Sequence, residues 1–242
     1  TSNFRAGVNA GNSIESGGNY NTVVGDEAGT AITTGDYNTA VGMNALIATT
    51  TAVSNTALGF KALYANITGA SNTAVGTNSL DANTTGASNV AVGQSALGGN
   101  TTASENTAVG ANALAANTTG DLNVAIGGNA LQSNVAGDRA VAIGYQALAV
   151  QNPSGNVDTY NVAIGLNSQS NTTTGVHNVA VGGASLAANT TASNNTAVGT
   201  SALGANTTAS NNTAVGFEAL RLNTTGQYNV AMGAYALDSN TT

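Results

Sequence analysis

A short phrase of apolar and polar residues returns every 17 residues along this chain. One full copy, Asn106 to Gly120, reads Asn-Thr-Ala-Val-Gly, two variable residues, Ala-Leu, and a polar turn ending in Asn-Thr-Thr-Gly. The glycine that closes the first five residues recurs at 17-residue steps from Gly25, with one longer step of 21 residues between Gly144 and Gly165, and an earlier, degenerate copy ends at Gly7. A fixed period of this size is typical of repeat architectures. Residues 1–242 are therefore predicted to be a single repeat domain of about 14 coils.

The first five residues of each repeat alternate in the manner of a β-strand. Thr107 and Val109 share one face, and Asn106, Ala108 and Gly110 share the other. The Ala-Leu stretch is too short for an isolated helix, and Gly, Asn and Thr are poor helix formers. A repeat of 17 residues accommodates two strands of about four or five residues and two turns. The predicted fold is an all-β parallel β-solenoid (β-roll) whose coils stack at about 4.8 Å.

Two apolar columns are predicted to face the interior. The first is the Val or Ile of the strand, a position that is never polar: Val41, Val75, Val109, Ile126, Ile164 and Val198. The second is the leucine five residues later: Leu46, Leu80, Leu114, Leu148, Leu203 and Leu237. The asparagine that opens each repeat is expected to form a side-chain ladder, as asparagine does in stacked β-structures.

The alanine of each strand lies on the face opposite the predicted core, as Ala40 and Ala108 do. Such a column of small apolar side chains suits close approach by another chain, so we expect coils of different copies to share this seam. The alternative is that small residues fit the narrow inside of one coil. The expected partner is a second copy of the chain, in a trimer or an end-to-end filament. The last residues, Asn240 to Thr242, stop in mid-phrase, which favours a segment or subunit of a longer fibre.

Charge and composition argue against several classes of function. The chain has four Lys and Arg against 11 Asp and Glu, a net charge of −7. It carries too few cations to neutralise a run of phosphates, so nucleic-acid binding is not expected. No run approaches the length of about 18 apolar residues that a membrane span needs. The absence of cysteine removes disulfides and thiolate metal sites.

No enzyme is expected. The acidic residues fall at different places in the repeat and form no regular calcium ladder. His177, the only histidine, has no nucleophile at motif spacing. The glycines are spread one per repeat rather than clustered into a phosphate loop. The sequence therefore predicts no catalytic residues, no metal site and no cofactor.

Two irregularities suggest a place for a ligand. The long step holds four extra residues and the only proline, and predicts a loop at about residues 150–159. Loops often carry recognition, although an insertion can also be merely tolerated. Several rings immediately precede the opening asparagine, at Tyr20, Tyr37, Tyr160, His177 and Tyr228. They could bind sugars, or cover apolar edges and fill an interface. The candidate ligand contacts are Asn152, Pro153, Asp158, Tyr160 and His177.

The polar turns allow two further interpretations. Asn-x-Thr sequences recur at Asn66, Asn83, Asn117, Asn189, Asn206 and Asn223, and are better explained by turn chemistry than by glycosylation. Threonines also repeat at two adjacent positions, as in Thr84-Thr85 and Thr101-Thr102. A regular array of threonines on a solenoid could order water, so ice binding is the alternative function.

The phrase resembles the head repeats of YadA-like trimeric autotransporter adhesins, most closely at Asn123–Gly127 and Asn161–Gly165. The longer form with Ala-Asn-Thr-Thr-Gly is similar to repeats of phage tail-fibre and bacterial surface-fibre proteins. The resemblance covers nearly the whole chain and implies a left-handed, usually trimeric β-roll that acts in adhesion, although the adhesin repeat is shorter. The expected function is a non-catalytic extracellular fibre on a cell or virion surface, which contacts a host-surface glycan or protein.

Overall fold

The computed structural model describes residues 2–242. It confirms an all-β parallel β-solenoid of about 13 turns with a spacing of about 17 residues, and the described residues contain no helix. The chain divides into two compact units, Thr1–Thr119 and Gly120–Thr242, which are described separately below.

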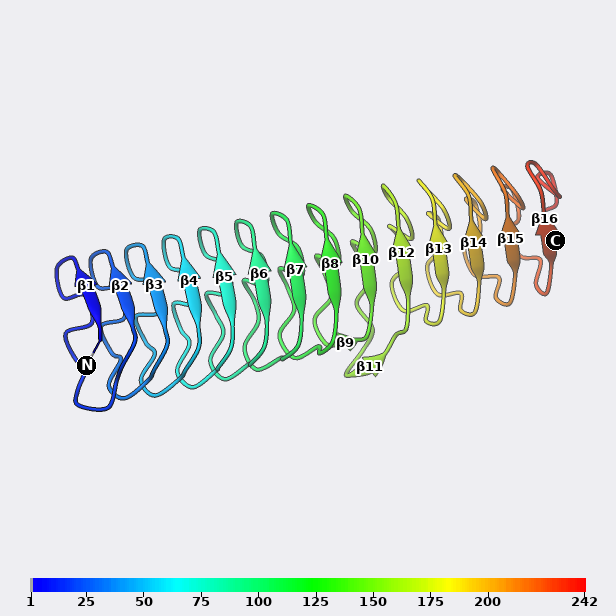
Figure 1. The fold of residues 1–242 in the computed structure, drawn as a ribbon. Coiled ribbons are helices and arrows are strands. Elements are labelled where there is room, and N and C mark those ends of the chain that lie inside the picture. Colours follow the sequence, from blue (N-terminus) through cyan, green and yellow to red (C-terminus); the bar gives the residue numbers. More distant parts are fainter. Residues whose placement is uncertain (1) are drawn as a thin grey trace. The chain divides into compact units, whose positions relative to one another are not determined.

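Unit 1 stacks one short strand per coil in chain order (Figure 1). All neighbouring strands are parallel and in register, so that Ala74 lies beside Ala91 and Val75 beside Val92. The strands are β1 (Phe4–Ala6), β2 (Thr22–Val24), β3 (Thr39–Val41), β4 (Thr56–Leu58), β5 (Thr73–Val75), β6 (Val90–Val92) and β7 (Thr107–Val109).

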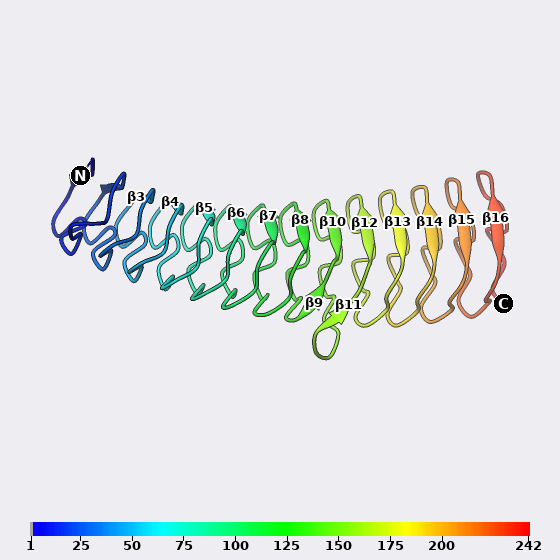
Figure 2. The same ribbon diagram turned by 60° about the horizontal axis from the view of Figure 1, so that its bottom comes forward.

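Unit 2 repeats this arrangement and adds a small second sheet. Its main sheet contains β8 (Val124–Ile126), β10 (Val141–Ile143), β12 (Val162–Ile164), β13 (Val179–Val181), β14 (Thr196–Val198), β15 (Thr213–Val215) and β16 (Val230–Met232). The second sheet pairs β9 (Gly137–Asp138) with β11 (Val157–Asp158). β11 belongs to the inserted segment, which protrudes as a loop from the coils in Figure 2.

Each coil contributes one three-residue strand to the main sheet, and apart from β9 and β11 the described residues contain no second strand in a coil, in place of the two longer strands expected. The Ala-Leu segment turns instead, because the leucine adopts a left-handed backbone conformation, with φ of 52° at Leu97. A left-handed non-glycine residue costs about 1–2 kcal/mol, whereas full burial of a leucine side chain contributes about 1.5–3 kcal/mol. Burial therefore outweighs the strain. The turns still bond between coils, and Leu97 N–H donates to Ala113 O at 3.0 Å.

The leucine column forms the predicted core. Leu46, Leu80, Leu114, Leu148 and Leu203 are all fully buried. Leu237 is the exception, since its side chain is 52% exposed. It lies on the last coil of unit 2, where only the coil of Leu220 packs against it through a hydrogen bond from Leu220 N–H to Ala236 O at 2.9 Å.

The prediction for the valine column was wrong. Val41, Val75, Val109, Ile126, Ile164 and Val198 are half-buried or exposed on the outward face of the strands. The alanine between the two outward residues points inward, and Ala40 and Ala108 are fully buried. The buried leucine occupies the space opposite the strand and leaves room there only for alanine. In β2, where Gly29 replaces the leucine, Val23 is fully buried at the same inward position. Alanine therefore fills the inside of its own coil and forms no seam between copies.

Two asparagine ladders satisfy the polar groups that face inward. In the first, Asn89 N–H donates to Asn72 Oδ1 at 3.0 Å, and Asn106 N–H donates to Asn89 Oδ1 at 3.0 Å. In the second, Asn83 Nδ2 donates to Asn66 Oδ1 at 2.8 Å and to a backbone carbonyl of its own turn at 3.0 Å. The expected ladder is therefore confirmed, and the turn asparagines form another.

In the main sheet, two constraints act on a glycine that follows a strand, as at Gly182. Gly182 has a φ of +136°, and a Cβ built on it would lie 2.6 Å from the backbone of Gly199 in the next coil. The next residue, Gly183, lies outside the left-handed region of φ, and no atom lies within 4 Å of a Cβ built there. These two adjacent glycines therefore make a matched pair.

We predict that Gly182→Ala lowers the free energy of unfolding by about 2–4 kcal/mol, because it adds left-handed strain and a backbone clash. Gly183→Ala should change that free energy by less than about 1 kcal/mol, since its methyl group meets open space. Urea denaturation followed by circular dichroism measures both. Equal effects of the two substitutions would contradict the close-approach argument.

Candidate functional site

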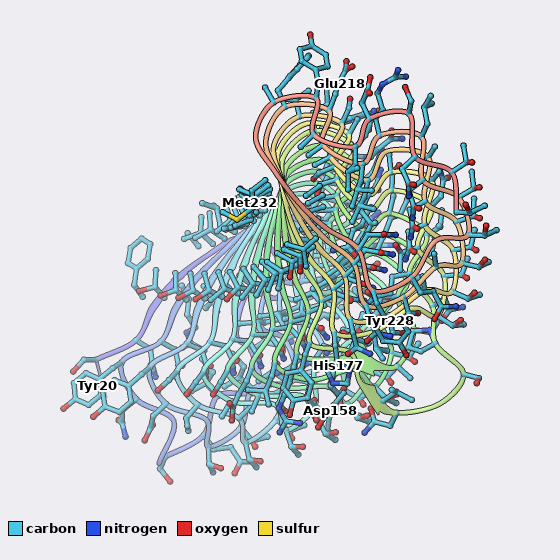
Figure 3. All side chains as sticks on the ribbon, turned by 90° about the vertical axis from the view of Figure 1, so that its right-hand side faces the viewer. Tyr20, Asp158, His177, Glu218, Tyr228 and Met232 are labelled. Atoms are coloured by element: carbon cyan, nitrogen blue, oxygen red, sulfur yellow. The ribbon has the colours of Figure 1, made fainter. Side chains whose placement is uncertain are left out.

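The outward face of the main-sheet strands is uncharged, and each of these strands from β2 onward presents at least one aliphatic side chain there. Every strand of the main sheet from β2 to β7 and from β8 to β16 presents two residues there, the first Thr or Val and the second Val, Ile, Leu or Met. In unit 2, both outward positions are aliphatic in four successive coils, β8, β10, β12 and β13. Met232 of β16 marks this face in Figure 3, on a different side of unit 2 from Tyr228 and Glu218. Contiguous exposed apolar surface of this kind is typical of interaction sites.

The inserted segment is ordered by bonds to the coil before it. β11 pairs with β9, and Thr159 Oγ1 donates to Asp138 O at 2.9 Å. Asn161 Nδ2 donates to the buried Gln151 Oε1 at 2.7 Å. The predicted loop at about residues 150–159 is thus present, with a short strand that the sequence did not indicate.

A cluster of charged and ring side chains surrounds this segment. Arg139 forms an ion pair with Asp158, and Tyr160 Oη donates to Asp158 Oδ2 at 3.2 Å. The guanidinium carbon of Arg139 lies 5.9 Å from the ring centroid of Tyr160. His177 stacks on that same ring, with centroids 5.5 Å apart and planes 15° apart. Arg139, Tyr160 and His177 therefore form a continuous stack beside the loop.

Asp138 lies where the loop and the coils meet. The backbone N–H of Asp121 donates to Asp138 Oδ1 at 2.7 Å. With its amide oriented to donate, Asn156 Nδ2 lies 2.9 Å from Asp138 Oδ1. Burial raises the pKa of Asp138 above its ordinary value of 3.8, and the carboxylates of Asp121 and Asp158 raise it further. The Asp121 backbone N–H and the Arg139 guanidinium lower this pKa and offset part of the effect.

Three of the five candidate ligand contacts, Asp158, Tyr160 and His177, lie together. The other two differ: Asn152 is exposed, whereas Pro153 is buried against Gly137 and cannot be a surface contact. Sequence reasoning missed Arg139, although it immediately precedes the opening position of its repeat, as Tyr160 and His177 do. It also missed Asp138, because the pairing of β9 with β11 has no signal in the repeat.

The two threonine columns differ in the hydrogen bonding of their hydroxyl groups. Thr84 Oγ1 donates to Thr101 O at 3.0 Å, and Thr101 Oγ1 donates to Thr118 O at 3.1 Å. The neighbouring column, which includes Thr85 and Thr102, is exposed. One of the two threonine columns therefore bonds to the backbone, and the other faces solvent.

The Asn-x-Thr sequences serve the turns, as expected. Their asparagines at 66, 83, 117, 189, 206 and 223 are fully buried. Asn189 Nδ2, for example, donates to Ala192 O at 3.1 Å. An enzyme could not reach these side chains in the folded chain.

No group of three or more His, Asp or Glu that could hold a metal ion is present within residues 2–242. Across the same residues, no helix is long and apolar enough to cross a membrane. Comparison with protein families, curated proteins and solved structures finds no match to this chain. The assignment of the repeat fold therefore rests on the geometry of the described residues.

We predict that Asp138 makes the chain less stable as pH rises. Between pH 3.8 and the raised pKa, the folded state holds more proton than the unfolded state, so the free energy of unfolding falls through this window. Asp138→Asn keeps an acceptor for the Asp121 N–H but does not titrate. Urea denaturation across this pH range should show the wild-type chain losing stability relative to Asp138→Asn. A relative gain with rising pH would contradict the prediction.

Proposed function

We propose that this chain is a structural module of a non-catalytic extracellular fibre, in which copies associate laterally through the outward face of their strands. The observation that carries the proposal is the uncharged outward face of each unit, on which every main-sheet strand from β2 onward presents at least one aliphatic side chain. An exposed surface of this kind is unfavourable in water and is typically covered by a partner.

A second copy is the partner that fits this face best. Each copy presents the same rows of side chains at the same coil spacing, so two faces can interdigitate over many coils, as identical side chains do in stacked β-sheets. A chain of net charge −7 repels its own copies. This face avoids that repulsion, because none of its outward residues is charged.

The energetic balance also favours association through unit 2. The four coils β8, β10, β12 and β13 present eight outward Val and Ile side chains. If completing the burial of each contributes about 1 kcal/mol, the set contributes about 8 kcal/mol. Association costs about 4–15 kcal/mol. These four coils offset much of that cost, and burial of the outward residues of the remaining coils provides further favourable free energy.

Adhesion is the second part of the proposal. The loop tip at residues 154–157 and the rings of Tyr160 and His177 are exposed at one edge of unit 2. Figure 3 places His177 and Asp158 together on this edge, away from Met232. A laterally assembled fibre would leave this edge open to a host-surface glycan or protein, with the stacked coils acting as a stiff support.

We predict that Ile164→Lys breaks the assembly while the coil stays folded. Ile164 is 36% exposed on the outward face, and a lysine there would place charge against charge between copies. Thr174→Lys adds the same charge to an exposed turn of the same repeat and serves as the control. Light scattering measures the mass, and circular dichroism checks the fold.

The outcomes of this experiment are distinct. Monomeric Ile164→Lys beside oligomeric Thr174→Lys supports the lateral interface. If both variants assemble as the wild-type chain does, the outward face is not the interface and an end-to-end filament becomes the better explanation. A wild-type chain that is a 23.4 kDa monomer at all concentrations would contradict self-association.

Ice binding is a second candidate, favoured by the exposed column that contains Thr85 and Thr102. Because the adjacent column bonds to the backbone, this array is a single row rather than a plane. A thermal-hysteresis measurement separates the two functions. Absence of hysteresis and of ice shaping removes this candidate and leaves the fibre proposal untouched.

A further inference from the structure

Two tyrosine rings stack on the surface of unit 1. The ring centroids of Tyr20 and Tyr37 lie 5.1 Å apart, and the ring planes differ by 5°. Both side chains project into solvent, with 57% and 59% of their surfaces exposed. Tyr20 is labelled in Figure 3, where it points away from the coils. Neither ring is therefore needed to fill the core.

The stack ends at Tyr37, because the next coil has a serine at the equivalent place. Ser54 N–H donates to Asp36 O at 3.0 Å, just as Tyr37 N–H donates to Asn19 O at 3.1 Å one coil earlier. The backbone φ is 58° at Tyr37 and 60° at Ser54, so the two side chains leave the coil in the same way. Serine is too short to cover the ring of Tyr37, and one face of that ring is left open at the level of Ser54.

We propose that this open ring face, together with Ser54, is a binding site for a pyranose sugar. A pyranose has an apolar face of C–H groups that packs on an aromatic ring, and a rim of hydroxyl groups that need hydrogen-bond partners. A sugar placed at the level of Ser54 would continue the stack of Tyr20 and Tyr37. The site lies apart from the outward strand face, and its existence does not depend on the fibre proposal.

Ser54 is the neighbouring polar group that suits hydroxyls. Asp36 Oδ1 accepts the Asn19 backbone N–H at 2.6 Å, which directs the carboxylate toward the preceding coil and away from the level of Ser54. Ser54 is exposed and offers a hydroxyl that both donates and accepts. An aromatic side chain of a peptide would stack on the same ring but make no hydrogen bond to the Ser54 hydroxyl, so the surroundings favour the sugar.

Unit 2 supplies an internal comparison. Tyr160 is also exposed and stacked, but Arg139 lies over its ring and His177 stacks on it. No equivalent open face remains on Tyr160. The two stacks therefore differ: one ring face of Tyr37 is left uncovered, whereas Arg139 and His177 cover the ring of Tyr160.

The test is saturation-transfer NMR on the full chain with the methyl glycosides of glucose, galactose, mannose and N-acetylglucosamine. A single exposed stack with few hydrogen bonds should bind with a dissociation constant of about a millimolar. We expect saturation of the C–H protons on one face of at least one glycoside. Tyr37→Phe should keep this signal, because the ring does the packing, and Tyr37→Leu should weaken binding at least about tenfold.

The decisive variant is Ser54→Arg, which covers the open face of the Tyr37 ring with a guanidinium, as Arg139 does at the Tyr160 ring, and adds no new ring. Arginine occupies the equivalent position at Arg139, so the variant should fold, and it should abolish the signal. Tyr145→Leu removes an exposed tyrosine outside both stacks, and as the control it should leave the signal unchanged. An unaltered signal in Ser54→Arg, or loss in Tyr145→Leu, would overturn the assignment. Saturation of p-cresol with none of any glycoside would also overturn it, in favour of an aromatic side chain.

Discussion

Backbone hydrogen bonds between residues one repeat apart are the interaction on which the rest of the structure depends. They run through the strand, where Gly93 N–H donates to Val75 O at 2.8 Å, and through the leucine turn, where Leu97 N–H donates to Ala113 O. Because these bonds hold every coil in the same register, each side chain lies on its own equivalent. This geometry permits asparagine on asparagine and ring on ring. It also demands glycine wherever two backbones come closest.

The insertion interrupts this stacking of equivalent residues, and nearby side chains compensate for the interruption. Ala140 replaces the opening asparagine just before the insertion, and Gln151 supplies the missing acceptor by bonding Asn161. In the following coil Gln169 stands in the leucine column, and its Oε1 is buried without a hydrogen-bond partner. The core is therefore less complete here than elsewhere. The β9–β11 pair and the Arg139–Asp158 ion pair hold the loop against the coils in compensation.

Residues that support the fold and residues that could contact a ligand occupy different positions within the repeat. Positions that face inward or approach the next backbone hold Ala, Leu, Asn and Gly with few exceptions, since any other residue would clash or be left unpaired. The position before the opening asparagine is exposed and left-handed, and it carries Tyr, Ser, Glu, Leu, Arg, His or Asn. Variation at this one position places a ring beside a serine in unit 1 and an arginine beside a ring in unit 2.

The 17-residue period by itself determined the class of fold, the stacking of equivalent residues, the buried leucines and the place of the insertion. Period-two alternation defines two faces of a strand but does not say which face is inside. The tertiary structure decided that, because a leucine turned inward in the left-handed conformation fills the space opposite Ala108, and Val109 faces outward. The pairing of Asp158 with Asp138 was likewise decided in three dimensions, since an irregular insertion has no equivalent residue from which its contacts can be read.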